Sequence, residues 1–249
     1  SLVANHFRPL KGISDINLAT HGPYANYNSL QTTWARTRGR YMMSLNYTFA
    51  KALGIINNGS YDPYNIRNNY GVQASDRTHL FNLAYSVEMG NPVKNRIAGG
   101  LANGWQVSGL VQVQSGANLT SNRGNNWGMN TNGYKIPGTT HNVSSASLLG
   151  TPNIPLRPLV TCDPGANLQP QQYVNQACFA MPTRVGQNGP TTLPVQYGPA
   201  FFNADLALFK NFNIKEGMKL QFRANAYNFL NHPLWSFDSA TNLTLGFNG

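Results

Sequence analysis

The amino-acid sequence predicts an all-β fold, an antiparallel meander of about six long strands. Three observations support this prediction. Apolar side chains recur at every second position in several segments of roughly 10 residues, which is the period of a strand. Long and short connections alternate between those segments. Only 10% of the residues are charged, against roughly 25% in ordinary soluble domains.

The first two strands are expected at residues 24–36 and 40–50. The second has the clearer alternation, with one polar side and one side of large apolar residues, namely Tyr41, Met43, Leu45, Tyr47 and Phe49. Residues 37–39 join the two segments. Because so short a link joins neighbouring antiparallel strands, we expect a hairpin.

Four further segments repeat the pattern. Residues 79–89 carry Phe81, Leu83 and Tyr85 on one side, and residues 104–115, 202–208 and 218–227 alternate in the same way. The connections between strands are therefore 37–39, 51–78, 90–103, 117–200 and 213–217. Segments 51–78 and 117–200 have no helical or strand period and are expected to be long loops.

We expect one β-barrel domain over residues 1–249, with a lead-in at 1–23, four strands at 24–116, a long external loop at 117–200 and the last strands at 201–249. The long loop holds ten of the fifteen prolines and both cysteines. Cys162 and Cys178 are candidates for a disulfide, worth about 3 kcal/mol in the chain-entropy model, which implies an oxidising compartment. Two unpaired thiols are the alternative.

Strands of this length with one polar and one apolar face occur both in membrane barrels and in soluble proteins. A tilted membrane-spanning strand needs about 9–11 residues, and outer-membrane barrels have short periplasmic turns and long external loops. In that arrangement, residues 51–78 and 117–200 lie outside the cell, and one face of the sheet meets lipid. The expected lipid-facing residues are Tyr41, Met43, Leu45, Tyr47, Phe49, Phe81, Leu83 and Tyr85. A soluble β-sandwich gives the same alternation with its apolar face inward.

The order of several segments resembles a known family. These are GRYMMSLNYTFAKAL, DRTHLFNLAYSVEMG, NGWQVSGLVQVQSG, CFAMP and the long run GPAFFNADLALFKNFNIKEGMKLQFRANAYNFLNHP. Together they resemble the C-terminal barrel portion of TonB-dependent outer-membrane receptors, and more narrowly the subgroup with an N-terminal carboxypeptidase-regulatory-like domain. The resemblance covers nearly all of residues 24–235.

The resemblance implies a barrel of about 22 strands closed by a plug, located in the bacterial outer membrane and energised through TonB. The partners implied are membrane lipid, the plug and N-terminal barrel of the receptor, TonB through them, and an unknown small nutrient. Six strands are fewer than the roughly eight of the smallest outer-membrane barrel. We therefore expect a segment of a longer chain, an assembly of several copies or another use of the sheet.

Few residues are candidates for a site. Asp205 and Arg223 are expected on the polar faces of adjacent strands, where they would form an ion pair in the lumen. Trp127 and Tyr134 are candidates for a ligand-contacting loop, with packing within the loop as the alternative. Asp76 is expected to anchor a loop at the rim. No catalytic, metal-binding or cofactor-binding motif is present in the sequence, so we expect no enzyme and no cofactor.

Three functions remain open at this point. The first is a C-terminal barrel segment of a nutrient receptor. The second is a self-assembling extracellular fibre or oligomer, in which copies pair through unpaired strand edges. The third is a soluble sandwich that binds at the cell surface. The net charge is +10, but the basic residues are too dispersed to indicate a nucleic-acid partner.

Overall fold

The computed structural model describes residues 22–55, 65–119, 128–152, 154–192, 194–215, 217–235 and 244–246. Six long strands dominate these residues: β1 (Ala25–Arg36), β2 (Tyr41–Ile55), β4 (His79–Glu88), β5 (Trp105–Gln114), β9 (Phe201–Lys215) and β10 (Met218–Ala226). The short elements are η2 (Ile66–Asn69), β3 (Tyr70–Val72), α1 (Arg96–Ala102), β6 (Gly128–Asn130), α2 (Ser145–Leu149), β7 (Leu159–Val160), η4 (Gln176–Cys178), β8 (Phe179–Ala180) and β11 (Thr244–Gly246).

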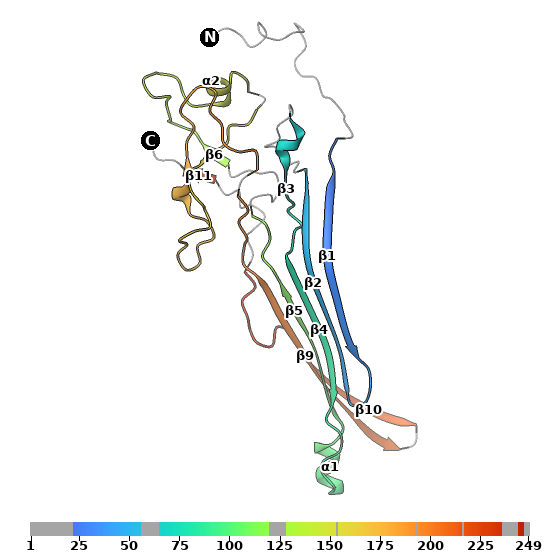
Figure 1. The fold of residues 1–249 in the computed structure, drawn as a ribbon. Coiled ribbons are helices and arrows are strands. Elements are labelled where there is room, and N and C mark those ends of the chain that lie inside the picture. The colour runs from blue at the N-terminus through green and yellow to red at the C-terminus, as the bar shows by residue number, and fades with distance from the viewer. Residues whose placement is uncertain are drawn as a thin grey trace.

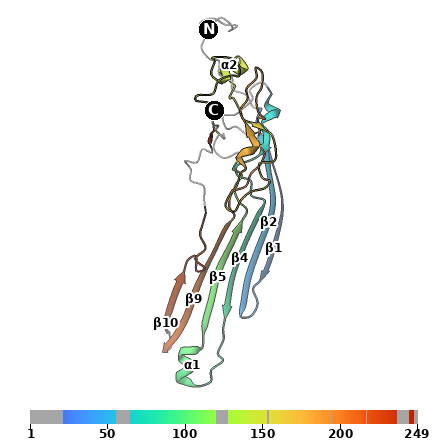
Figure 2. The ribbon, with the colours of Figure 1, turned by 90° about the vertical axis from the view of Figure 1, so that its left-hand side faces the viewer.

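The long strands form one antiparallel sheet in the order β1-β2-β4-β5-β9-β10, with β3 paired to β2. This confirms the predicted fold class. The hairpin between β1 and β2, the helix α1 and the hairpin between β9 and β10 lie at one end of the sheet, which we call the turn end (Figures 1 and 2). The long connections, with β3, β6 and α2, lie at the opposite end, called the loop end below.

Tight turns at the turn end depend on glycine. Gly39 has a φ of 77° between β1 and β2, and Gly217 has a φ of 75° between β9 and β10. These left-handed conformations are accessible to glycine at little steric cost. Each turn reverses the chain within a few residues. The β1–β2 pair then keeps one register along its length, whereas the β9–β10 pair has a register shift between Met218 and Lys219.

The sheet and its connections at 51–78 and 90–103 differ from the sequence-based expectation in four places. Strand β2 runs five residues past Ala50 to Ile55, and β9 continues to Lys215. The predicted loop at 51–78 contains β3, which pairs with the end of β2. The connection at 90–103 contains the helix α1, which the sequence conceals because Gly99 and Gly100 are poor helix formers.

The residues that follow β5 fold into a body at the loop end (Figure 1). Its core contains Val143, Leu148 and Met181, all buried, with Tyr134 among the partly buried residues packed against them. The helix α2 begins with a capping box, in which Ser144 accepts a hydrogen bond from the backbone N–H of Ser147 and the side chain of Ser147 accepts one from Ser144. The connection therefore has a small hydrophobic core of its own.

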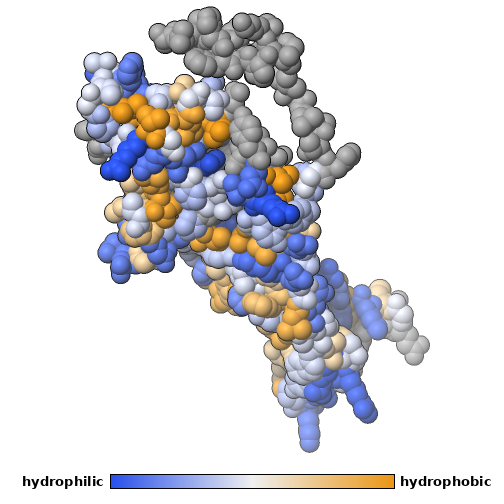
Figure 3. Space-filling view, turned by 45° about the horizontal axis from the view of Figure 1, so that its top comes forward, coloured by the Kyte–Doolittle hydropathy of each residue, from blue (hydrophilic) through white to orange (hydrophobic). Residues whose placement is uncertain are grey.

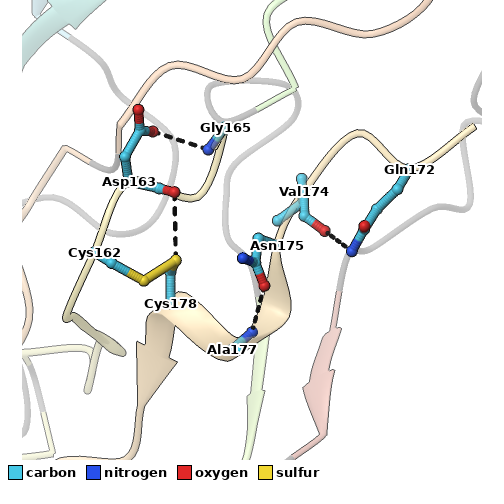
Figure 4. The surroundings of a disulfide bond; sticks show 8 residues. All are labelled: Cys162, Asp163, Gly165, Gln172, Val174, Asn175, Ala177 and Cys178. Carbon is cyan, nitrogen blue, oxygen red and sulfur yellow. Dashed lines mark hydrogen bonds between the residues drawn. A yellow bond between two sulfur atoms is a disulfide. The ribbon is translucent and has the colours of Figure 1, made fainter. Parts of the chain in front are cut away.

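A disulfide joins Cys162 to Cys178 inside this body (Figure 4). Cys178 is buried and ends the turn η4, directly before β8. Asn175 caps that turn by accepting a hydrogen bond from the backbone N–H of Ala177, at 3.1 Å. The cross-link holds the segment before β8 against the residues that follow β7.

Candidate functional site

One face of the sheet has polar side chains at many of its register positions. Across five strands, one row contains Thr33, Asn46, Asn82, Gln112 and Asn203. The next rows toward the turn end add Ser44, Ser86, Ser108, Asp205 and Asn225. Side chains of this kind are costly to bury without partners, so this face requires water or a polar partner.

Hydrogen bonds connect neighbouring strands across the polar face. Thr33 Oγ1 lies 3.0 Å from Asn46 Oδ1, and Gln106 Nε2 donates to Ser86 Oγ at 2.7 Å. Gln221 Nε2 donates to Asn211 Oδ1 at 3.1 Å. These bonds satisfy only part of the hydrogen-bonding capacity of an amide-rich surface, which leaves groups able to bind water or solute.

The opposite face is mainly apolar from β2 to β10, and β1 adds Leu30 and Trp34 to it. The sequence-predicted lipid-facing residues lie on this one face, because Tyr41, Met43, Leu45 and Tyr47 pair with Val87, Tyr85, Leu83 and Phe81. Beyond β4 the same rows continue through Val107, Val111 and Val113 on β5 and through Phe202, Leu206 and Leu208 on β9. Each strand thus separates a polar surface from an apolar one.

An open depression of about 270 Å³ lies on the polar face where β5, β9 and β10 meet. It is lined by Ser108, Gly109, Leu110, Asp205, Leu206, Ala207, Asn225 and Tyr227. Asp205 Oδ1 accepts hydrogen bonds from Asn203 Nδ2 at 3.1 Å and from the backbone N–H of Asn228 at 2.9 Å. The carboxylate supplies a negative charge to the depression and also holds the chain that leaves β10.

The expected lumen pair of Asp205 and Arg223 is not formed. Arg223 pairs in register with Phe209, and its guanidinium carbon lies 4.8 Å from the centre of that ring. Its Nη2 donates to Gln221 Oε1 at 3.3 Å. Asp205 lies four residues along β9 from Phe209, so the pairing register of β9 and β10 separates the two charges.

A buried carboxylate organises the rim at the loop end. Asp76 is 1% exposed, and its Oδ1 accepts a hydrogen bond from the backbone N–H of Ala52 at 2.6 Å. Its Oδ2 lies 3.3 Å from Lys51 Nζ and 3.2 Å from the hydroxyl of Tyr197, which itself accepts from Lys51 Nζ at 3.0 Å. Asp76 therefore anchors the end of β2, the entry to β4 and the last part of the long connection.

Sequence reasoning identified Asp76 but missed its partners. Lys51 occupies an apolar-face position of β2, and a lone cation there is a signal that a partner is needed. Tyr197 lies in a segment without any period and gives no such signal. A second missed residue is Lys210, which is 1% exposed and lies on the apolar face of β9.

The two candidates for a ligand-contacting loop have different outcomes. Tyr134 packs against the core of the loop-end body, and its backbone carbonyl accepts a hydrogen bond from the N–H of Val143 at 2.9 Å. This is the packing that was the alternative for Tyr134. Trp127 lies outside the described residues.

No group of three or more His, Cys, Asp or Glu residues in the described part of the chain is arranged to hold a metal ion. No helix within this part is long and apolar enough to cross a membrane.

A two-faced antiparallel sheet with short turns at one end and long connections at the other defines the class of outer-membrane barrel walls. The chain belongs to the family described as the outer membrane beta barrel domain, whose model matches residues 1–247. No curated protein and no solved structure matches the chain. Membership places the chain in the bacterial outer membrane, where its apolar face contacts lipid. The soluble β-sandwich alternative does not fit this membership.

Proposed function

We propose that the chain is the C-terminal barrel segment of a TonB-dependent outer-membrane receptor that imports a scarce nutrient. The observation that carries the proposal is the polar row from Thr33 on β1 to Asn203 on β9. Small eight-stranded barrels fill their interior with packed side chains, whereas wider barrels enclose water or a plug. Five polar side chains in one uninterrupted row suit a wide, wet lumen. The segment order described above supports the TonB-dependent class within the family.

In this proposal the loop end lies outside the cell. A rigid body on the connection between β5 and β9, with a core and a disulfide, is suited to ligand contact because its surface is held in place. Lys51 and Asp76, near the two ends of segment 51–78, are joined to the last part of this connection through the hydroxyl of Tyr197. Nutrient specificity would then reside in residues 51–78 and 117–200.

The two edges of the sheet need partners. All twelve residues of β1 and all nine of β10 are exposed, and both strands have a second neighbour in a closed barrel. In the receptor, the remaining barrel strands pair at these edges, and the plug contacts the polar face. Self-assembly is the second candidate function, because other copies of this chain could pair at the same two edges.

Uptake assays in whole cells test the receptor proposal. Accumulation of a panel of labelled nutrients, including iron chelates, cobalamin and oligosaccharides, is compared between cells with and without the gene. Each strain is tested with TonB intact and with TonB deleted. The proposal expects one class of nutrient to accumulate only when both the gene and TonB are present. It fails if expression of the protein changes no TonB-dependent uptake, or if the gene encodes no plug.

Electron microscopy of the purified protein distinguishes the two candidates. A receptor segment gives particles that remain dispersed in detergent. Copies that pair through β1 and β10 give filaments or closed rings whose abundance rises with protein concentration.

A further inference from the structure

The helix α1 at the turn end is a firmly held element. Asn95 caps its first turn by accepting hydrogen bonds from the backbone N–H groups of Ile97 and Ala98, at 2.9 and 3.2 Å. The side chain of Asn103 donates to the carbonyl of Val93 at 2.7 Å and accepts from its N–H at 2.9 Å. The Asn103–Val93 hydrogen bonds join the beginning of the 90–103 connection to its end, so α1 keeps one orientation relative to the strands.

Two large apolar side chains of α1 point away from the rest of the protein. Ile97 is 84% exposed and Leu101 is 70% exposed, whereas Gly99 between them is buried. At about 100° per residue, Ile97 and Leu101 project from the side of α1 roughly opposite Gly99. A glycine at 99 is required because a β-carbon there would lie 2.9 Å from the side-chain nitrogen of Asn103 and from the carbonyl of Val93.

The carboxyl end of α1 is bonded to the apolar face of the sheet. Lys210 Nζ donates to the carbonyls of Leu101 at 2.8 Å and Asn103 at 2.6 Å. The indole N–H of Trp105 also donates to Leu101, at 2.8 Å. Lys210 lies 5.0 Å from the ring centres of both Trp105 and Phe212. The helix is therefore continuous with the aromatic end of the lipid-contacting surface.

Basic residues are concentrated around the three connections of the turn end. The exposed ones among the described side chains are Arg36, Arg38, Arg40, Lys94 and Lys219, against the acidic residue Glu88. Hydrophilic side chains extend from this lower end of the molecule in Figure 3. Positive charge beside exposed apolar side chains is the pattern of a segment that lies in a membrane interface.

We propose that α1 is a helix that lies in the membrane interface, and we call it the foot. Ile97 and Leu101 enter the boundary between headgroups and acyl chains of the leaflet at the turn end, and Lys94 and Arg38 contact the phosphates of anionic glycerophospholipids. The inference rests on the apolar face contacting lipid, as the receptor proposal also requires. It adds a lipid contact beyond the end of the strands, at a connection that would otherwise lie in water.

Site-directed fluorescence tests the foot in the complete gene product. The disulfide uses both cysteines of this chain, so cysteines introduced as Ile97→Cys, Leu45→Cys or Val185→Cys give a specific label position in each variant. Each is labelled with the environment-sensitive dye NBD and reconstituted into phosphatidylethanolamine vesicles containing phosphatidylglycerol. Lipids with doxyl groups near the glycerol report contact with the interface.

Leu45 tests the face of the sheet, and Val185, which is 80% exposed in the loop-end body, is the aqueous control. The foot is supported if the label at position 97 shows blue-shifted emission and loses intensity with doxyl lipid, while position 185 does neither. Unquenched, red emission at 97 with normal lipid contact at 45 overturns the foot and leaves the barrel intact. Blue-shifted but unquenched emission at 97 overturns it in favour of a protein partner. Absence of lipid contact at 45 contradicts the membrane assignment itself.

The charge contribution is tested separately. The double variant Lys94→Gln, Arg38→Gln is expected to reduce doxyl quenching at position 97 in vesicles with phosphatidylglycerol. In pure phosphatidylcholine vesicles the same variant should leave quenching unchanged. Arg184→Gln, an exposed position of the loop-end body, is the matched control and should have no effect in either. Equal quenching of the double variant and the control in anionic vesicles contradicts the phosphate contact.

Discussion

The ring of Tyr85 lies over Gly109, its register partner on the neighbouring strand, at the centre of the apolar face. A β-carbon at position 109 would lie 2.5 Å from the phenol oxygen of Tyr85 and 2.7 Å from the carbonyl oxygen of Asp205. The glycine thus makes room for an aromatic ring on one side and for the adjacent strand on the other.

Gly109→Ala is expected to destabilise the sheet by about 1–3 kcal/mol, the range for overpacking a filled site. The measurement is the midpoint of urea unfolding, followed by the loss of the compact band on unheated gels. Gly100→Ala is the control, because a β-carbon there meets nothing within 4 Å and alanine favours a helix. Equal midpoints for Gly109→Ala and the natural protein would show that β5 shifts at no cost.

Asp76→Ala is expected to destabilise the rim at the loop end more than Tyr197→Phe. The alanine removes a buried carboxylate that accepts hydrogen bonds from the backbone N–H of Ala52, the ammonium of Lys51 and the hydroxyl of Tyr197. The expected cost is on the order of 2–3 kcal/mol. Tyr197→Phe removes one hydroxyl and should cost about 1 kcal/mol. Hydrogen exchange of residues 51–55 and 70–78 measures the effect. The anchor role is wrong if Asp76→Ala leaves their exchange unchanged.

Replacing both cysteines, Cys162→Ser with Cys178→Ser, should destabilise the loop-end body by about 3 kcal/mol, the chain-entropy value for a loop of this length. The sheet should keep its unfolding midpoint, because the cross-link closes a separation of 16 residues within one connection. Limited proteolysis of residues 128–192 reports the change. Reductant should reproduce it in the natural protein and add nothing to the double variant. A matching fall in the midpoint of the sheet would contradict an independent body.

A double-mutant cycle with Asp205→Asn and Arg223→Gln should give a coupling energy within about 0.3–0.5 kcal/mol of zero. Four residues of strand separate the register positions of the two side chains, or about 13 Å, and such distances leave substitutions additive. A cycle of Arg223→Gln with Phe209→Leu should give a larger coupling, because the guanidinium lies over that ring. A strong coupling energy between Asp205 and Arg223 would show that the two side chains do form the ion pair expected from the sequence.

The long strands follow from the sequence because alternation of side chains reports the two faces directly. The end of β2 could not be predicted in this way, because polar and apolar residues do not alternate clearly over Lys51, Ala52, Leu53 and Gly54. The helix α1 is hidden for a different reason: its stability comes from Asn95, Asn103 and Lys210 and not from the helix propensity of its own residues.

The candidate site was predicted in part. The residues of the polar and apolar faces could be assigned from period alone, but cross-strand neighbours require the register. That is why Asp205 and Arg223 were paired incorrectly, and why Tyr197, distant in sequence from Asp76, could not be found. Contacts that join a loop to a strand depend on the full path of the chain.

The order of strands also has a consequence for how the wall is assembled. Strands β1 and β2, and likewise β9 and β10, are joined by turns of a few residues, so each pair can zip from its turn. Strand β9 must find β5 across all of residues 115–200, which makes that ladder the most non-local in the sheet and the slowest to form. The four strands β1-β2-β4-β5 and the hairpin β9-β10 then meet along a single seam between β5 and β9. The exposed edge of β5 before that meeting is the point at which a wrong partner strand could insert.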